Sequence, residues 1–271
     1  MSRATAGIDR LAMAITACVV LCGSEDSCDG NHSVHSTNVA TGSMSADITA
    51  RAIGNGRTHV RVKLESGNGQ SDVDLSGGGR LVAKRIDPTT LREQTKDLVE
   101  QENLDAFAYT GTFNNQEKDY AIEVAFDRSA TGRASANGSV LAMPTPFELD
   151  WVEDPVSMKA APKSFSRSSA TPYFVTWDPF DALDFEPGDV LSYDVFGNCI
   201  QPFSGAIDWP GGGDALQLTG VLQDQAPPRD GLSCRLHVVI SLRRTGVIDP
   251  AFASGSFVGK QVRELHLEST P

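Results

Sequence analysis

The stretch Arg235-Leu236-His237-Val238-Val239-Ile240-Ser241-Leu242-Arg243 is the part of the chain that decides the fold class. Its apolar side chains recur at every second position: Leu236, Val238, Ile240 and Leu242. The positions between them are mostly polar: Arg235, His237, Ser241 and Arg243. A period of two places these groups on opposite faces of an extended chain, so the stretch predicts a half-buried β-strand.

The same alternation recurs along the rest of the chain. Apolar residues alternate in this way in three further segments: Val60 to Leu64, Tyr120 to Phe126, and Phe147 to Trp151. Turn-forming Gly, Asn, Asp and Pro residues separate the segments. Short alternating strands with polar turns between them are typical of a β-sandwich, so we expect an all-β protein.

One segment, Asp87 to Leu104, departs from this alternation. It is rich in Glu, Gln and Lys, and four of its residues follow a helical spacing: Leu91, Thr95, Leu98 and Glu102. Asp87 could cap such a helix, with Pro88 in the first turn. We therefore predict one short surface helix inserted between strands.

The N-terminus has the order of a secretory signal. Arg3 and Arg10 precede the uncharged apolar run Leu11 to Leu21, and the polar stretch Gly23 to Ser27 follows it. The run is much shorter than the ~20 residues that span a bilayer as a helix, but it fits the apolar region of a signal peptide. The alternative is a buried core helix. We expect export to the cell envelope.

Within the apolar run, Ile15-Thr16-Ala17-Cys18 resembles the lipobox of bacterial lipoprotein signals. In those signals the cysteine is lipidated and becomes the first mature residue, so Cys18 is the candidate. Cys22 has a more polar following sequence, but Leu21 stands directly before it, which the motif disfavours. A third alternative is simple secretion, with both cysteines removed or oxidised. Two acyl chains on one cysteine are enough for stable anchoring.

The five cysteines can be divided into one lipid carrier and two bridges. If Cys18 carries lipid, the remaining four pair as Cys22–Cys28 and Cys199–Cys234, and an even count suits an oxidising compartment. The Cys199–Cys234 bridge would stabilise the fold by about 3–4 kcal/mol in the chain-entropy treatment. The alternative is a pair of buried free thiols.

Composition divides the chain into four parts. From Cys28 to about Ser45 it is Ser, Asn, Gly, Thr and His with few aliphatic residues, which predicts a flexible tether. Two prolines between Glu153 and Lys163 mark a second boundary. We expect two tandem Ig-like β-sandwich domains with Trp177 in the core of the second one. The predicted parts are a signal and lipobox segment (1–22), a tether (23–45), domain 1 (46–153) and domain 2 (154–271).

Short phrases along almost the whole mature chain resemble a group of predicted bacterial lipoproteins and secreted proteins. The phrases are Tyr109-Thr110-Gly111-Thr112-Phe113, Met143-Pro144-Thr145-Pro146-Phe147, Val175-Thr176-Trp177, Gly197-Asn198-Cys199-Ile200, Ser241-Leu242-Arg243-Arg244 and the ending from Gly259-Lys260-Gln261-Val262-Arg263 to Ser269-Thr270-Pro271. The resemblance implies a two-part β-rich lipoprotein with a Cys199–Cys234 bridge. The group has no assigned activity, so the resemblance implies no catalytic residues.

Composition and motifs argue against several functions. The formal net charge of −12 opposes nucleic-acid binding, which needs a clustered positive field. The sequence contains neither a G-x-S-x-G nucleophile motif nor an H-E-x-x-H zinc motif. We therefore expect a protein that is not an enzyme and needs no cofactor, with calcium as the one candidate ion.

Two weaker features point to ligands. An acidic run could hold calcium through its carboxylates or could be a solvated loop face: Asp178, Asp181, Asp184, Glu186 and Asp189. Trp209 lies in a turn-rich stretch, where it could stack on a sugar ring or plug one end of a sandwich.

These features favour a non-catalytic cell-envelope lipoprotein that spaces, binds or assembles at the cell surface. It would contact a membrane through its lipid, on the periplasmic or the exterior face, and its other partner would be a protein or a polysaccharide. The alternative is a carbohydrate- or calcium-dependent surface binding module.

Overall fold

The alternating segments form strands whose apolar side chains are buried. β18 (Cys234–Thr245) contains the stretch that decides the fold class, and its four alternating aliphatic side chains are fully buried. β3 (Arg57–Ser66) and β9 (Ala121–Asp127) bury their apolar residues in the same alternating way. β11 (Glu148–Asp154) begins directly after the buried Phe147. The all-β prediction is confirmed.

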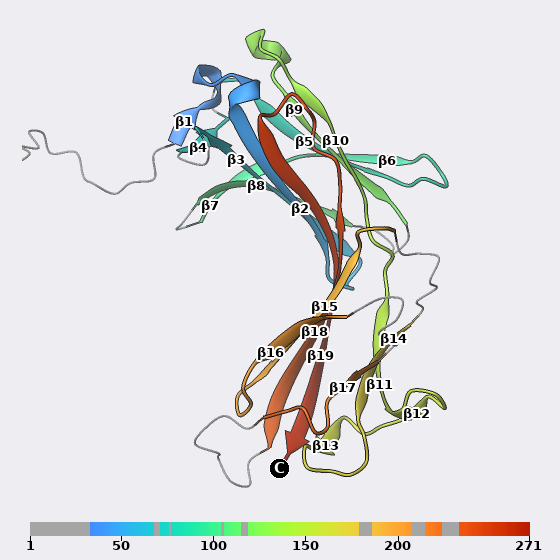
Figure 1. Ribbon diagram of the computed structural model, residues 1–271. Helices are drawn as coiled ribbons and strands as arrows, with labels where there is room; N and C mark the ends of the chain where they lie inside the picture. The colour runs from blue at the N-terminus through green and yellow to red at the C-terminus, as the bar shows by residue number, and fades with distance from the viewer. Residues whose placement is uncertain are drawn as a thin grey trace, which may run out of the picture. The chain divides into compact units, whose positions relative to one another are not determined.

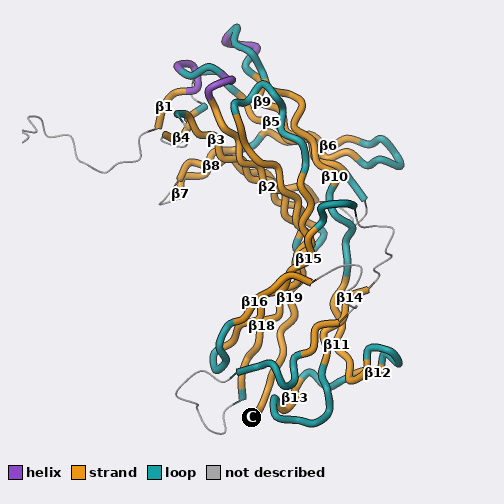
Figure 2. Tube along the Cα trace, viewed as in Figure 1, coloured by secondary structure: helices purple, strands orange, loops and turns teal. Residues whose placement is uncertain are grey.

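A computed structural model describes residues 33–67, 71–75, 77–103, 106–114, 119–178, 186–207, 215–223 and 233–271 of the chain. Strands dominate this part, as Figure 2 shows. Its helical elements are three short 3₁₀ turns: η1 (Ser36–Asn38), η2 (Thr41–Ser43) and η3 (Ser129–Thr131). No helix among the described residues has the length and apolar composition needed to cross a membrane.

The largest sheet combines strands from both halves of the sequence (Figure 1). In spatial order its main path is β1 (Ser33–His35), β4 (Ser71–Asp74), β3, β2 (Met44–Ala52), β19 (Ser254–Thr270), β18, β15 (Val190–Gly197) and β16 (Phe203–Ile207). Beside this path, β8 (Ala106–Asn114) pairs with β3 and with β7 (Val99–Asn103), and β13 (Ser164–Ser166) pairs with β19.

Two four-stranded sheets complete the fold. The first has the order β10 (Ala136–Ala142), β9, β5 (Arg80–Ile86) and β6 (Glu93–Asp97). The second has the order β12 (Lys159–Ala160), β11, β14 (Phe174–Asp178) and β17 (Ala215–Gln217).

Each small sheet shares a hydrophobic core with part of the large one. The first core joins Ile48 and Val62 of the large sheet to Phe126 of β9. The second core joins Val238 of β18 to Trp177 of β14, which is buried as predicted. Apolar faces of two sheets packed in this way form a β-sandwich, so the predicted sandwich class is confirmed.

β19 contributes to both cores. Phe257 near its start lies in the first core, whereas Leu265 and Leu267 near its end lie in the second. The strand has 17 residues, and at ~3.3 Å per residue it is about 55 Å long. It pairs in parallel with β2 and antiparallel with β18. The predicted domain boundary between residues 153 and 154 falls at the end of β11 and stays a prediction.

A disulfide joins Cys199 to Cys234, with the two Cα atoms 5.7 Å apart. Cys234 is the first residue of β18 and is fully buried in the second core. Cys199 is half-buried against the same core. The predicted bridge is confirmed, and the alternative of two free thiols is wrong.

The predicted surface helix over residues 87–104 is wrong. The segment contains a turn followed by two strands, β6 and β7. Asp87 does act as a cap, but of a turn: its Oδ1 accepts hydrogen bonds from the backbone N–H groups of Thr89 at 2.9 Å and Thr90 at 3.0 Å. These bonds lower the pKa of the Asp87 carboxyl.

The segment lacks the apolar face that would hold a helix against a core. Leu98 is buried, whereas Leu91 and Val99 are exposed, and Leu91 takes a left-handed backbone conformation that ends the turn. All five residues of β6 are exposed, and β6 lies at the edge of its sheet. Charged side chains protect such an edge from pairing with other chains. An exposed edge strand and an exposed helix therefore have similar compositions.

The predicted flexible tether over 23–45 is wrong for residues 33–45, which form β1, η1, η2 and the start of β2. Arg128, fully buried, stabilises this segment: its Nη1 donates to Thr41 Oγ1 at 2.8 Å, and its Nη2 donates to the backbone oxygen of Ser36. Burial lowers the pKa of this guanidinium. These hydrogen bonds act together with apolar packing, because Val34, Val39 and Met44 of the segment pack in the first core. Residues 23–32 lie outside the described residues.

Tyr109 of β8 links its strand to the end of β4 through its buried hydroxyl. The hydroxyl donates to the backbone oxygen of Val73 at 2.9 Å and accepts from the backbone N–H of Leu75 at 3.0 Å. Burial raises the pKa of this phenol. We expect Tyr109→Phe to lower the free energy of unfolding by about 1–2 kcal/mol in urea titrations, because it leaves a backbone acceptor and a backbone donor without this partner.

Tyr193→Phe in β15 is the matched control for this prediction. That ring is half-buried and lies edge-on to Phe203, with 5.8 Å between centroids. Its loss of a hydroxyl should change the free energy of unfolding by less than about 0.5 kcal/mol. Equal effects of the two substitutions would contradict the role given to the Tyr109 hydroxyl.

Candidate functional site

Two carboxylates of the predicted acidic run form ion pairs with Arg244. Asp189 accepts two hydrogen bonds from the guanidinium, from Nε at 2.9 Å and from Nη2 at 2.7 Å. Glu186 accepts a third, from Nη1 at 3.1 Å. The bonds to Asp189 raise the pKa of Arg244 more than burial lowers it. Because the side chain of Asp189 is 2% exposed and uses both oxygens on an arginine, we infer that it serves the fold rather than a cation.

The other predicted site residues fall where the structure gives no side chain. Asp178 ends β14, but its side chain is not described, and Asp181, Asp184 and Trp209 lie outside the described residues. Cys18, Cys22 and Cys28 also lie outside them. Calcium binding by the acidic run, sugar binding by Trp209, lipidation and the Cys22–Cys28 bridge therefore stay predictions.

A second cluster of ionisable side chains lies on the outer face of the large sheet. Within the described part of the chain, His237, Glu264 and His266 form a group of residues whose donor atoms all lie within 4.8 Å of one another. His237 belongs to β18, and the other two residues belong to β19. All three side chains are accessible, with exposed fractions of 34%, 46% and 65%.

Both imidazoles approach the same carboxylate oxygen. His237 Nδ1 lies 2.9 Å from Glu264 Oε1, and His266 Nε2 lies 3.6 Å from the same atom. The two imidazole rings meet edge to face, with 4.5 Å between centroids and 76° between planes. The arrangement places two nitrogen donors and one oxygen donor around a common point.

The register of the strands creates this cluster. In the antiparallel pair of β18 and β19, His237 lies directly opposite His266. Glu264 precedes His266 by two residues, so it points to the same face. The neighbouring residues on the inner face, Leu236 and Leu267, are buried and anchor both strands in the second core.

An exposed aromatic ring extends the cluster onto a third strand. Phe196 of β15 lies opposite His237 in the strand pairing, and its ring stacks on the imidazole with 5.0 Å between centroids and 8° between planes. One face of the His237 imidazole is therefore packed against an aromatic ring, while Nδ1 lies beside Glu264.

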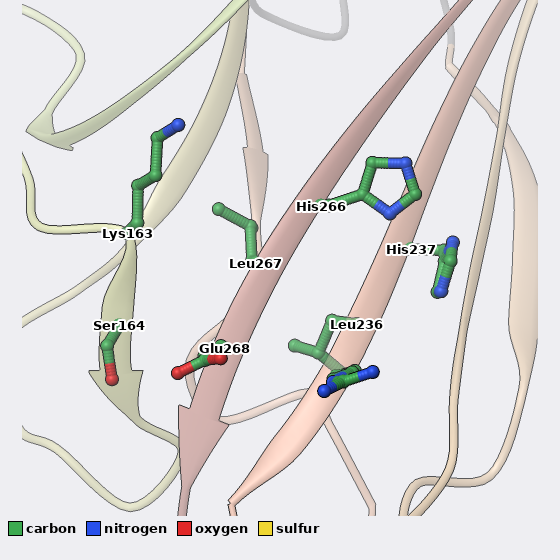
Figure 3. Close-up of a pocket in the computed structure, with 8 residues that line it drawn as sticks. Lys163, Ser164, Leu236, His237, His266, Leu267 and Glu268 are labelled. Carbon is green, nitrogen blue, oxygen red and sulfur yellow. The ribbon is translucent and has the colours of Figure 1, made fainter.

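The two histidines also line a pocket of about 480 Å³, shown in Figure 3. Lys163 and Ser164 line it from the segment at the start of β13, and Arg235 and Glu268 line it from β18 and β19. Leu236 and Leu267 complete the lining, so the pocket combines charged and apolar side chains.

Sequence reasoning identified His237 only as a polar residue on the outer face of its strand. The alternation Glu264-Leu265-His266-Leu267-Glu268 could have placed Glu264 and His266 on one face of a final strand. The missing information was the register between this strand and β18, which brings His266 opposite His237.

No protein-family model matches the chain, and comparison with curated proteins finds no match. Among the solved structures that match is the adhesin InvE of Yersinia pseudotuberculosis, at 13% sequence identity and a TM-score of 0.20. The match covers 84% of this chain and 60% of the InvE chain, so this chain spans less than two thirds of that protein. A similarity this low assigns no function.

Proposed function

We propose that this chain is a non-catalytic protein of the bacterial cell envelope, attached to a membrane by lipid on Cys18. Its β-sandwich body would face the periplasm or the exterior, where it spaces, binds or assembles with other surface components. A protein or a polysaccharide is the partner class that this role requires.

The observation that carries the proposal is the Cys199–Cys234 bridge in an all-β body. Disulfides persist in oxidising compartments such as the periplasm and the cell surface, and they are rare in the cytosol. The charged start, apolar run and polar exit at the N-terminus supply an independent signal for export to such a compartment. Two unrelated features of the chain thus support the same location.

The described ionic groups support a binding role over catalysis. The buried pair of Arg244 and Asp189 is engaged in mutual hydrogen bonds. The exposed cluster of His237, Glu264 and His266 lies on an open sheet face, which does not exclude water from a reacting centre. Both arrangements suit a rigid body that presents a surface.

The test of this proposal is membrane fractionation of the wild-type chain and a Cys18→Ser variant in a host that processes lipoproteins. We expect the wild-type protein in the membrane fraction, released by detergent but not by high salt. Cys18→Ser removes the lipid-bearing sulfur, so we expect that variant in the soluble exported fraction. Cys22→Ser is the matched control and should stay with the membrane.

Two outcomes would contradict parts of the proposal. If Cys18→Ser stayed with the membrane while Cys22→Ser was released, the lipid would be assigned to Cys22. If the wild-type chain itself was soluble, the anchor would be excluded altogether.

A further inference from the structure

We propose that His237, Glu264 and His266 bind a divalent transition metal ion of the zinc class on the outer face of the large sheet. The inference goes beyond the envelope role, and it does not depend on lipid attachment. Failure of the metal test would leave the fractionation result unaffected, and the reverse also holds.

The donor set points to this class of ion. Zinc is commonly bound by imidazole nitrogen and carboxylate oxygen, and a site with three protein ligands keeps its fourth position for water. Calcium and magnesium prefer sites built from oxygen alone. Two nitrogens and one carboxylate oxygen, contributed here by His237, His266 and Glu264, therefore favour zinc over the calcium considered for the acidic run.

Two of the three donor-atom separations lie near those around such an ion, and the third, between the imidazole donors of His237 and His266, is at most 4.8 Å. Ligands bonded at ~2.0–2.2 Å in tetrahedral geometry lie about 3.2–3.6 Å from one another. His266 Nε2 and Glu264 Oε1 are 3.6 Å apart, and His237 Nδ1 and the same oxygen are 2.9 Å apart. The His237–Glu264 hydrogen bond would open by a few tenths of an ångström as the ion replaced the shared proton.

The sheet holds these side chains in position before any ion binds. β18 is paired along both edges, with β15 and β19, so the backbone at His237 is fixed on two sides. The stacked ring of Phe196 then restricts the imidazole itself. A site built on rigid strands needs less ordering when it binds, and that raises affinity.

The local charges allow a cation at this position. Glu264 supplies a negative charge at the centre, and the chain as a whole carries a formal charge of −12, which favours cation binding. Arg235 adds a positive charge two residues from His237, but it lies opposite Glu268 in the strand register. Its charge is therefore offset at the edge of the site.

The experiment is calorimetric titration of the full-length chain with zinc chloride under oxidising conditions. We expect the zinc affinity to fall by more than about 10-fold in His237→Ala and in His266→Ala, because each removes a ligand. The matched control is His59→Ala in β3: that exposed histidine bonds to Thr112 Oγ1 at 2.9 Å, away from the cluster in the sheet order. It should retain the wild-type affinity.

A second pair of variants separates ligation from general negative charge. Glu264→Gln should weaken zinc binding, since a neutral amide is a poorer ligand than a carboxylate. Glu93→Gln removes the same charge from the exposed edge strand β6 of another sheet, and this variant should bind zinc like the wild type. Equal losses in both variants would overturn the assignment of Glu264 as a ligand.

Two further measurements distinguish the loss of a zinc ligand from unfolding of the protein. Zinc should shift the imidazole ¹H–¹⁵N signals of His237 and His266 but not those of His59, and thermal unfolding should show that the exposed substitutions leave the fold intact. Wild-type zinc affinity in a His237→Ala/His266→Ala double variant would overturn the proposal. Calcium displacing zinc at equal concentration would overturn the choice of metal class.

Discussion

Arg244→Met is expected to lower the free energy of unfolding by about 3–5 kcal/mol, the usual cost of removing one partner from a buried ion pair. Arg244 occupies an inward position of β18, beyond Leu242, and its side chain is 9% exposed. Its partner Asp189 is 2% exposed and accepts two of its hydrogen bonds. After the substitution Asp189 keeps the bond from the backbone N–H of Glu186, but loses its compensating charge.

Urea unfolding with a matched control measures this cost. Arg243→Met removes the same charge from the neighbouring exposed position of β18 and should change stability by less than about 0.5 kcal/mol. Adding Asp189→Asn to Arg244→Met should restore at least about 1 kcal/mol, since the buried charge is then gone. If Arg244→Met were no more costly than Arg243→Met, the ion pair would have no structural role.

Loss of the Cys199–Cys234 bridge is expected to lower the free energy of unfolding by about 3–4 kcal/mol. The bridge joins cysteines with a sequence separation of 35 residues. It therefore lowers the conformational entropy of the unfolded chain, which stabilises the folded state relative to it. The Cys199→Ala/Cys234→Ala variant tests it, because reduction of the wild-type protein would also open any other bridge. Urea unfolding of the oxidised wild type and of this variant gives the difference.

The single variant Cys199→Ala is the control for packing in this comparison. Cys234 is fully buried, so Ala at that position also removes a sulfur atom from the second core. Cys199→Ala keeps that sulfur, leaves any other bridge intact, and should still lose most of the stability that the bridge contributes. If the double variant and the oxidised wild type differed by less than about 0.5 kcal/mol, the bridge would contribute little to the fold.

The buried strands could be predicted from the sequence because their apolar residues alternate with polar ones, and the apolar residues are the ones that become buried. In β9, and in β18 as far as Leu242, every second side chain is apolar and buried, so a period of two was sufficient. The bridge was also predictable, since the cysteine count left few pairings. The sharing of β19 between two cores was not, because it depends on which strands pair rather than on local pattern.

Exposed and polar segments gave the wrong predictions. β6 lies at a sheet edge with every side chain in solvent. Its sequence therefore has no apolar residues whose spacing could distinguish a strand, with a period of two, from a helix, with a period of about 3.6. Residues 33–45 are held in part by hydrogen bonds from Arg128, a residue about ninety positions away along the chain. Long-range polar contacts of this kind leave no periodic signal in the segment that they stabilise.

The candidate metal site illustrates the same limit. His237 and His266 are far apart in sequence, and each appears alone as an ordinary polar residue on an outer strand face. Only the register of β18 against β19 brings them together, and a shift of one residue would send His266 to the opposite face. The acidic run was more conspicuous in the sequence, yet its Asp189 is committed to Arg244.

The intact mass of the mature protein from its native host, with and without reduction, tests the envelope proposal most directly. The proposal predicts a chain that starts at Cys18, carries acyl groups, and gains two hydrogen atoms for each bridge on reduction. Cys199–Cys234 accounts for one such gain, and the predicted Cys22–Cys28 bridge accounts for the other. An unlipidated chain that starts beyond Cys22 would contradict membrane anchoring and would redirect the search to soluble extracellular ligands.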